Sequence, residues 1–229
     1  MEDNISRIIS IAQGLKELNS RVVYVGGAVV QFYADDAAAI EPRATVDVDC
    51  VVKYDSFKDK VSFENRLREL KFYEDREDGV ICRWNHNNEK IDIIPSDERF
   101  LSFTNRWYEY GVETQQKYRI NDEYVINIMP VLVYLATKLE AVESRGGSDL
   151  RCSHDFEDFI YVLNSCSTLF DQYEEEKNSD LKNFIRSEAN HLISRKYIRE
   201  EKECVLPYGE EQRLEYVMSL LCRLAENIL

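Results

Sequence analysis

The sequence predicts an α+β fold, with a mixed β-sheet core flanked by helices and a helical C-terminal segment after it. In the first 129 residues, short apolar runs alternate with stretches of helical periodicity. From Pro130 onward, apolar residues recur only at helical spacing. Mixed sheets with helices segregated to one side produce this order. We therefore expect an α/β core over residues 1–129 and a helical domain over residues 130–229.

Helices and short strands alternate in the expected core. Gly26-Gly27 ends the first strand, and Pro95 ends the last one before the aromatic stretch that follows. The expected helices are 3–19, 28–34 and 57–71, and the expected strands are 21–25, 44–52, 72–73, 80–84 and 90–94, with a turn at 85–88.

The second part reads as helical throughout. The expected helices are 131–145, 155–163, a charge-rich stretch over 174–203 and a last helix with an apolar face from Leu214 to Ile228. No apolar stretch is long enough to span a bilayer, so we expect no membrane association. The first residues, MEDNISRIIS, lack the positive charge and apolar core of a signal peptide, and we expect a cytoplasmic protein.

Composition narrows the functional classes. The net charge of −14 disfavours broad, non-specific binding of nucleic acid, which needs Lys and Arg for the phosphates, and favours cationic partners. The six cysteines are scattered and form no C-x-x-C pair, so we expect free thiols without a zinc site or a disulfide framework.

Three aspartates in apolar strands are the candidate site. Asp47 and Asp49 stand at i and i+2 of one expected strand and therefore point to the same face. Asp92 lies in the apolar run KIDIIP of a later strand. Like charges buried together need something positive between them, and a hard divalent cation with oxygen ligands is one solution. Carboxylates from neighbouring strands could hold two Mg²⁺ ions that serve phosphoryl transfer.

The glycine pair Gly26-Gly27 lies at the expected strand-to-helix turn. Glycines at such a turn let the backbone approach a phosphate and direct N–H groups toward it. A glycine pair also suits any tight turn. The pair is followed by the motif R-x-T-x-D-x-D and by an aspartate in a later strand. These three features together are more specific for a phosphoryl-transfer site than any of them alone.

The chain resembles the nucleotidyltransferase superfamily with the polymerase-β-like fold, and within it the AbiEii-like toxin group. The matching segments are VGGAVVQFY, RATVDVDCVV, ICRWNH, KIDIIP, SFTNRWY and KLEAVESRGGSDLRCSHDFEDF, within residues 22–163. The resemblance implies that Asp47 and Asp49 are the paired metal-binding acids. It implies that Asp92 is the third acid, which binds metal and acts as base or orienter for the incoming hydroxyl. Gly26 and Gly27 then correspond to the phosphate-facing turn.

The resemblance also assigns roles to charged residues on the later helices. Lys138 corresponds to a helical lysine directed at nucleotide phosphates, and Arg145 lies seven positions later on the same helix face. Asp155 and Asp158 correspond to an acidic pair that orients these cations or contacts substrate. Arg43 and Thr45 precede the acids.

Each of these residues also has a structural interpretation. Arg43 or Thr45 could hold a phosphate or cap the turn, and Asp49 could pair with Arg43. Lys138 could extend to the surface, and Arg145 could complement a helix C-terminus. Asp155 could belong to an N-cap together with Ser153.

The expected activity is transfer of a nucleoside monophosphate from an NTP to a hydroxyl acceptor. The resemblance implies a toxin-like enzyme with tRNA or protein as acceptor and a cognate antitoxin as partner. The acidic balance keeps polycationic, aminoglycoside-type antibiotics open as acceptors. A catalytically silent module that binds nucleotide or antitoxin is the alternative of a different class.

Overall fold

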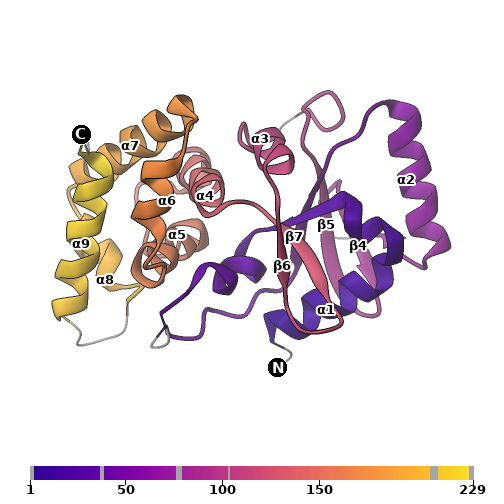
Figure 1. The fold of residues 1–229 in the computed structure, drawn as a ribbon, viewed down its shortest axis with the longest axis horizontal. Helices are drawn as coiled ribbons and strands as arrows, with labels where there is room; N and C mark the ends of the chain where they lie inside the picture. Colours follow the sequence, from indigo (N-terminus) through magenta and orange to yellow (C-terminus); the bar gives the residue numbers. More distant parts are fainter. Residues whose placement is uncertain (1–2, 37–38, 76–78, 103, 207–210, 227–229) are drawn as a thin grey trace. The chain divides into compact units, whose positions relative to one another are not determined.

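The computed structural model describes residues 3–36, 39–75, 79–102, 104–206 and 211–226 (Figure 1). Contacts between residues divide the chain into two compact units. Unit 1 comprises Met1–Val29 and Arg43–Pro130, and unit 2 comprises Val30–Pro42 and Val131–Leu229. The assignment of separate domains to 1–129 and 130–229 stays a prediction.

Unit 1 contains a seven-stranded sheet with the order β3-β4-β5-β2-β1-β7-β6. The pairs β2–β5 and β1–β7 are parallel, whereas the other neighbours are antiparallel. The mixed sheet and its helices confirm the predicted α+β class. The strands are β1 (Val22–Val25), β2 (Val48–Val52), β3 (Tyr73–Glu74), β4 (Arg83–His86), β5 (Glu89–Pro95), β6 (Gln116–Arg119) and β7 (Val125–Ile128).

The two predicted helices of unit 1 that form α-helices are shorter than the periodicity predicted. Helix α1 (Asn4–Leu15) begins at an N-cap in which Asp3 accepts from the backbone N–H of Ser6. It ends where Lys16 takes a φ of 51°, and a 3₁₀ helix, η1 (Lys16–Arg21), follows. The predicted helix over 28–34 is instead the 3₁₀ helix η2 (Gly27–Tyr33). Helix α1 packs against β5, and α2 (Phe57–Glu69) is capped by Ser56.

Two strands and one helix were not predicted. Helix α3 (Tyr108–Glu113) packs against β2, and strands β6 and β7 form an antiparallel pair at one edge of the sheet. Strand β6 is polar and mostly exposed, so its own sequence carries no apolar alternation. Its pairing with β7 supplies the backbone hydrogen bonds that define it as a strand.

A two-residue turn joins β4 to β5. Asn87 and Asn88 have φ values of 50° and 66°, the left-handed geometry that a tight hairpin requires and that Asn tolerates. This turn pairs His86 with Glu89, and the register then places Arg83 directly opposite Asp92. The turn therefore determines which side chain faces Asp92 from the neighbouring strand.

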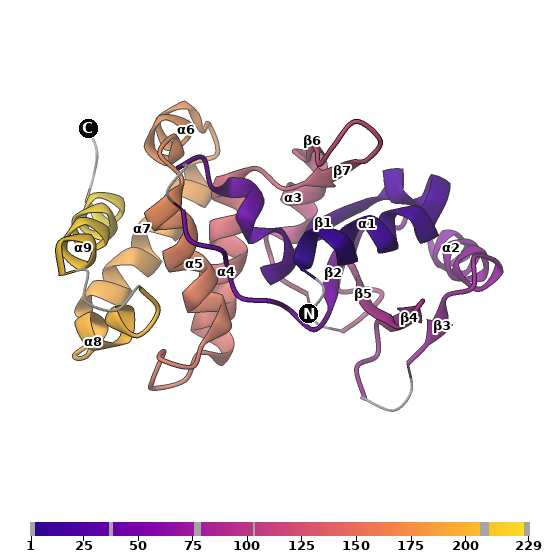
Figure 2. The ribbon, with the colours of Figure 1, turned by 90° about the horizontal axis from the view of Figure 1, so that it is seen from below.

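The part of unit 2 that begins at Val131 is a bundle of helices, coloured from rose through yellow in Figures 1 and 2. Its central helix α4 runs over Val131–Arg145, with the bounds that the sequence predicted, and it packs against α5, α6 and α7. The predicted stretch over 174–203 contains the last two residues of one helix and two further complete helices. The remaining helices are α5 (His154–Ser165), α6 (Leu169–Glu175), α7 (Ser179–Ser194), α8 (Ile198–Glu203) and α9 (Glu211–Ala225).

All six cysteines are described and carry free thiols. Within the described ranges, no helix combines the length and the apolar character needed to cross a bilayer.

Candidate functional site

Two of the predicted acids are direct neighbours in the sheet. In the parallel pair β2–β5, Asp49 is aligned with Asp92, so their side chains project from the same face. Asp92 is buried, and Asp49 is the half-buried position in a strand whose other residues are buried. Two apolar strands therefore bring two carboxylates side by side at a place where apolar side chains would pack well.

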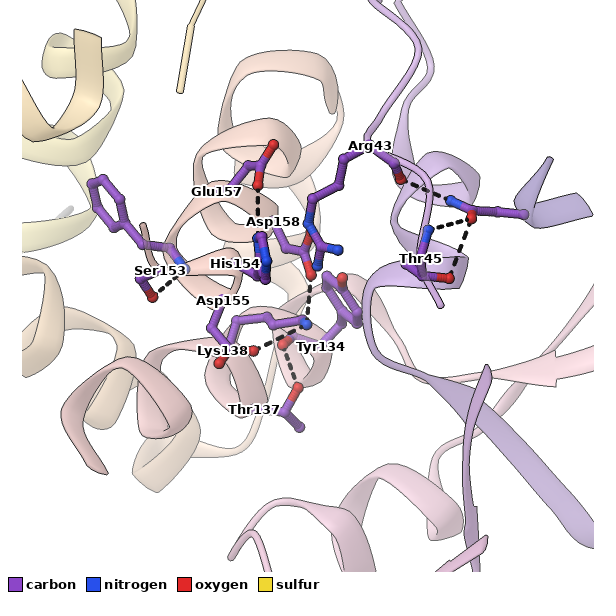
Figure 3. Close-up of polar contacts among 12 residues, drawn as sticks. Arg43, Thr45, Tyr134, Thr137, Lys138, Ser153, His154, Asp155, Glu157 and Asp158 are labelled. Carbon is purple, nitrogen blue, oxygen red and sulfur yellow. Dashed lines mark hydrogen bonds and ion pairs between the residues drawn. The ribbon is translucent and has the colours of Figure 1, made fainter. Parts of the chain in front are cut away.

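Asp47 lies just before β2, in a bend that shortens the predicted strand 44–52. The hydroxyl of Thr45 donates to the carbonyl oxygen of Asp47 at 2.9 Å, a local hydrogen bond that competes with strand pairing. Asn4 holds the same loop from α1: its Oδ1 accepts from the Thr45 N–H at 2.9 Å, and its Nδ2 donates to the Arg43 carbonyl at 3.1 Å (Figure 3). Thr45 therefore caps the turn, and the phosphate role of Arg43 and Thr45 stays a prediction.

The positive charge beside these acids is Arg83. Its Nε donates to Asp92 Oδ1 at 2.8 Å and its Nη2 donates to Asp92 Oδ2 at 2.9 Å, which is a bidentate pair. The same Nη2 lies 2.5 Å from Asp47 Oδ2. Asp47 and Asp92 thus share one guanidinium group, and both carboxylates contact its Nη2.

The electrostatics of Asp47 reflect this crowding. Burial is the main cause that raises the pKa of Asp47, and the negative charge of Asp92 adds to it. The charges of Arg83 and Arg43 oppose the increase. The neighbouring thiol responds in the same way, since burial together with Asp49 and Asp92 raises the pKa of Cys50. Burial and the neighbouring acid thus outweigh the effect of the nearby cations on the pKa of Asp47.

The glycine turn touches the acids directly. Gly26 has a φ of +73°, and a Cβ added to it would lie 2.0 Å from Asp49 Oδ2. Both the backbone conformation and the close approach require glycine at this position. Gly27 begins η2 immediately afterwards. The glycine pair and the acids thus form one locus at the end of β1 and the start of β2.

The donor set suits a hard divalent cation in its chemistry, because it offers carboxylate oxygens on one face. The arrangement in the structure is an ion pair, however. Among the residues described, no three His, Cys, Asp or Glu side chains are placed to hold a metal ion together. The guanidinium of Arg83 occupies the carboxylates of Asp47 and Asp92 instead.

The other predicted residues form a second group within unit 2. Lys138 Nζ lies 2.6 Å from Asp158 Oδ2 and 3.2 Å from Asp155 Oδ1 (Figure 3). Arg145 Nε donates to Asp155 Oδ2 at 2.8 Å. Lys138 is 6% exposed and Asp158 is 2% exposed, so Lys138 does not extend to the surface. The helices α4 and α5 are therefore joined by a buried charge network.

This network shows whether Asp155 acts as part of an N-cap or as an ion partner. Ser153 is the N-cap of α5 and accepts from the Phe156 N–H, whereas Asp155 lies in the first turn and binds Lys138 and Arg145. Burial alone would raise the pKa of Asp155, but the hydrogen bond from Arg145 and the charge of Lys138 lower it. Asp155 and Asp158 are both ion partners of Lys138 in the structure, and the roles of this group toward phosphate or substrate stay predictions.

Sequence reasoning missed two residues of the site. Arg83 lies within the segment ICRWNH, and the signal that could have found it is the Asn87-Asn88 hairpin turn, which pairs position 83 with position 92. Nothing in the sequence marked Asn4 as a residue of the site, because asparagine is common in the first turn of a helix.

No model of a known protein family matches the chain, and no curated protein matches it in sequence. Among solved structures, it is similar to the crystal structure of an antigenic nucleotidyltransferase-like protein from Paracoccidioides brasiliensis. The two chains are 16% identical, with a TM-score of 0.52, over 88% of this chain and 93% of the other. At this identity the likeness concerns the architecture, so the chain shares its fold with a nucleotidyltransferase-like protein.

Proposed function

We propose that the chain is a nucleotidyltransferase that moves a nucleoside monophosphate from an NTP to a hydroxyl acceptor. The observation that carries this proposal is the alignment of Asp49 with Asp92 on parallel strands, with Asp47 sharing the Arg83 partner of Asp92. Two acids on one apolar sheet face, with a third in the bend beside them, cost folding free energy and have no packing benefit. Groups kept at such a cost are candidates for chemistry.

Each group has a role in the proposed reaction. The acceptor oxygen bonds to the α-phosphorus, the bond to pyrophosphate breaks, and Asp92 takes the hydroxyl proton. The Gly26 turn brings backbone close to the acids, where it can face the phosphates. Mg²⁺ held by Asp47, Asp49 and Asp92 would neutralise phosphate charge and activate the acceptor. Lys138 would bind the triphosphate, a role that rests on the sequence resemblance alone.

The finer assignment follows the same resemblance. We propose a toxin-like enzyme of the AbiEii-like kind, with tRNA or a protein as acceptor and a cognate antitoxin as partner. The net charge of −14 makes a polycationic acceptor the main rival within the enzyme class.

Radiolabel transfer tests the activity and the acceptor together. The protein is incubated with Mg²⁺ and each of the four α-³²P-labelled NTPs, in separate reactions with total tRNA, a protein lysate or kanamycin. We expect label in the tRNA or protein fraction, and label in kanamycin would identify the aminoglycoside rival. The proposal would be contradicted if no fraction took up label with the parent protein and none did so with Asp92→Asn either.

The Arg83 ion pair favours a second candidate, a catalytically silent module. An arginine that permanently neutralises Asp47 and Asp92 would remove the need for a cation and would stabilise the face. Such a module would bind nucleotide, or an antitoxin, without transfer. Nucleotide binding by calorimetry, without label transfer under any metal tested, would favour it.

A further inference from the structure

Arg83 is held over the acids by the backbone and not only by charge. The Asn87-Asn88 turn fixes the β4–β5 register, and this register puts Arg83 directly across from Asp92. The Arg83 side chain is 12% exposed. The strand register therefore fixes the backbone of Arg83 opposite Asp92, whereas the guanidinium can still leave the carboxylates by rotation about the side-chain bonds.

The guanidinium engages both oxygens of Asp92 and one oxygen of Asp47. These are the oxygens that a divalent cation would need at the same place. Carboxylates have further lone pairs, but a cation bound to them would lie within a few ångströms of the guanidinium charge. Like charges at that separation repel strongly in a partly buried site. Arginine and cation thus act as alternatives for the same negative charge.

We propose that Arg83 is a built-in counter-ion of the acidic face, which a divalent cation must displace from Asp92 and Asp47 in order to bind. The inference rests on the proposed function, because that function places the cation on these acids. In the protein without metal, Arg83 stays paired with Asp92 and Asp47. Metal affinity is then set by the loss of the Arg83 pair as well as by the carboxylates.

Metal affinity in arginine variants tests this competition. We would titrate the full chain with Mn²⁺ and follow the free ion by its electron paramagnetic resonance signal. Arg83→Met removes the charge with a side chain of similar length, and Arg83→Lys keeps the charge without the bidentate geometry. Arg119→Met, on the exposed edge strand β6, is the matched control for loss of one strand arginine.

We expect Arg83→Met to bind Mn²⁺ at least about tenfold more tightly than the parent protein, or about 1.4 kcal/mol. Arg83→Lys is expected to fall between them, and Arg119→Met is expected to match the parent. Adding Asp92→Asn to Arg83→Met is expected to abolish the gain. Thermal unfolding gives a second readout: Mn²⁺ should raise the melting temperature of Arg83→Met more than that of the parent protein.

The outcomes separate this inference from the proposed function. Suppose that the parent protein binds Mn²⁺, that Asp92→Asn removes this binding, and that Arg83→Met binds Mn²⁺ no more tightly than the parent. This result overturns the counter-ion role of Arg83 and leaves the metal site in place. Absence of Mn²⁺ binding in the parent, Arg83→Lys and Arg83→Met overturns both. If Arg83→Met does not fold, the lysine variant decides, because parent-like affinity there contradicts the competition.

Discussion

Asp49 and Asp92 occupy aligned positions on adjacent parallel strands, so two carboxylates lie side by side on one face of the sheet. Hydrophobic strands place them there through their own register, since the apolar residues on either side of each acid are buried. This arrangement opposes stability, because adjacent like charges raise the free energy of the folded state. It is therefore best tested by changes that remove charge and keep shape.

Replacing either acid by its amide should stop the reaction without unfolding the protein. We expect Asp49→Asn and Asp92→Asn each to lower label transfer by about a hundredfold or more, because they remove charge that stabilises the transition state. Asp122→Asn, at an exposed position of unit 1, is the control and should keep parent activity. Active Asp49→Asn and Asp92→Asn proteins would argue against these acids as the catalytic group.

Gly26→Ala should damage the site beyond its backbone cost. Gly26 and Gly79 have similar φ values, +73° and +70°, but an added Cβ meets Asp49 Oδ2 at Gly26 and nothing within 4 Å at Gly79. Gly79→Ala thus measures the strain of positive φ alone, about 1 kcal/mol. We expect Gly26→Ala to cost more in urea unfolding and to reduce label transfer, whereas Gly79→Ala keeps it. Equal effects of Gly26→Ala and Gly79→Ala would show that the close approach of Gly26 to Asp49 does not matter for function.

The hairpin turn should control the position of Arg83. Asn88 has a φ of 66°, which a β-branched residue adopts only with strain. We expect Asn88→Val to destabilise the fold by about 1–2 kcal/mol and to weaken the Arg83 pair with Asp92. Asn88→Gly preserves the turn geometry and should stay within about 0.5 kcal/mol of the parent. Chemical unfolding measures the stability of both variants. Similar stability of the valine and glycine variants would contradict the role of the turn.

The sequence predicted those parts of the fold that carry their own pattern. The helix over Val131–Arg145 is apolar on nearly every side, and β1, β2 and β5 are apolar runs that end at glycine, bends or proline. Strand β6 was missed because it is polar and exposed, and its identity as a strand depends on a partner strand. Periodicity is local, whereas strand pairing is not.

The same distinction holds within the site. The apolar runs around Asp49 and Asp92 indicated two strands that carry an acid each, whereas the i, i+2 argument for Asp47 assumed a strand and Asp47 lies in a bend before β2. Arg83 was not predicted, because its position follows from a cross-strand register and not from its own neighbours in sequence. The sequence required a positive charge near the acids. Whether arginine or metal supplies it depends on three-dimensional placement.

Lys138 should be essential for the stability of unit 2. Lys138→Met leaves Asp158 without its 2.6 Å ammonium partner in a position that is 2% exposed. Breaking one side of such a pair costs about 3–5 kcal/mol. We expect Lys138→Met to unfold at much lower denaturant, and Asp158→Leu in the same chain to restore part of the loss. Lys177→Met, at an exposed position, is the control and should change stability by less than about 0.5 kcal/mol.

The stabilisation due to Asp155 should depend on pH in a defined direction. Burial opposes ionisation of Asp155, but Arg145 and Lys138 prevail and the pKa in the folded state is lowered. A group with a lowered folded pKa stabilises the protein above its unfolded pKa of about 3.9, and this contribution is lost as the pH falls through the folded value.

We therefore expect Asp155→Asn to be less stable than the parent by about 1–3 kcal/mol at pH 7, because a charged hydrogen-bond partner is lost. The difference should shrink as the pH falls below the unfolded pKa of about 3.9, because the unfolded carboxylate takes up a proton there and the folded carboxylate does so only at lower pH. Urea unfolding of both proteins at pH 7, 5 and 3.5 measures this change, with exposed Glu175→Gln as the control. A difference that stays constant or grows toward low pH would show that Asp155 acts through packing and not through its charge.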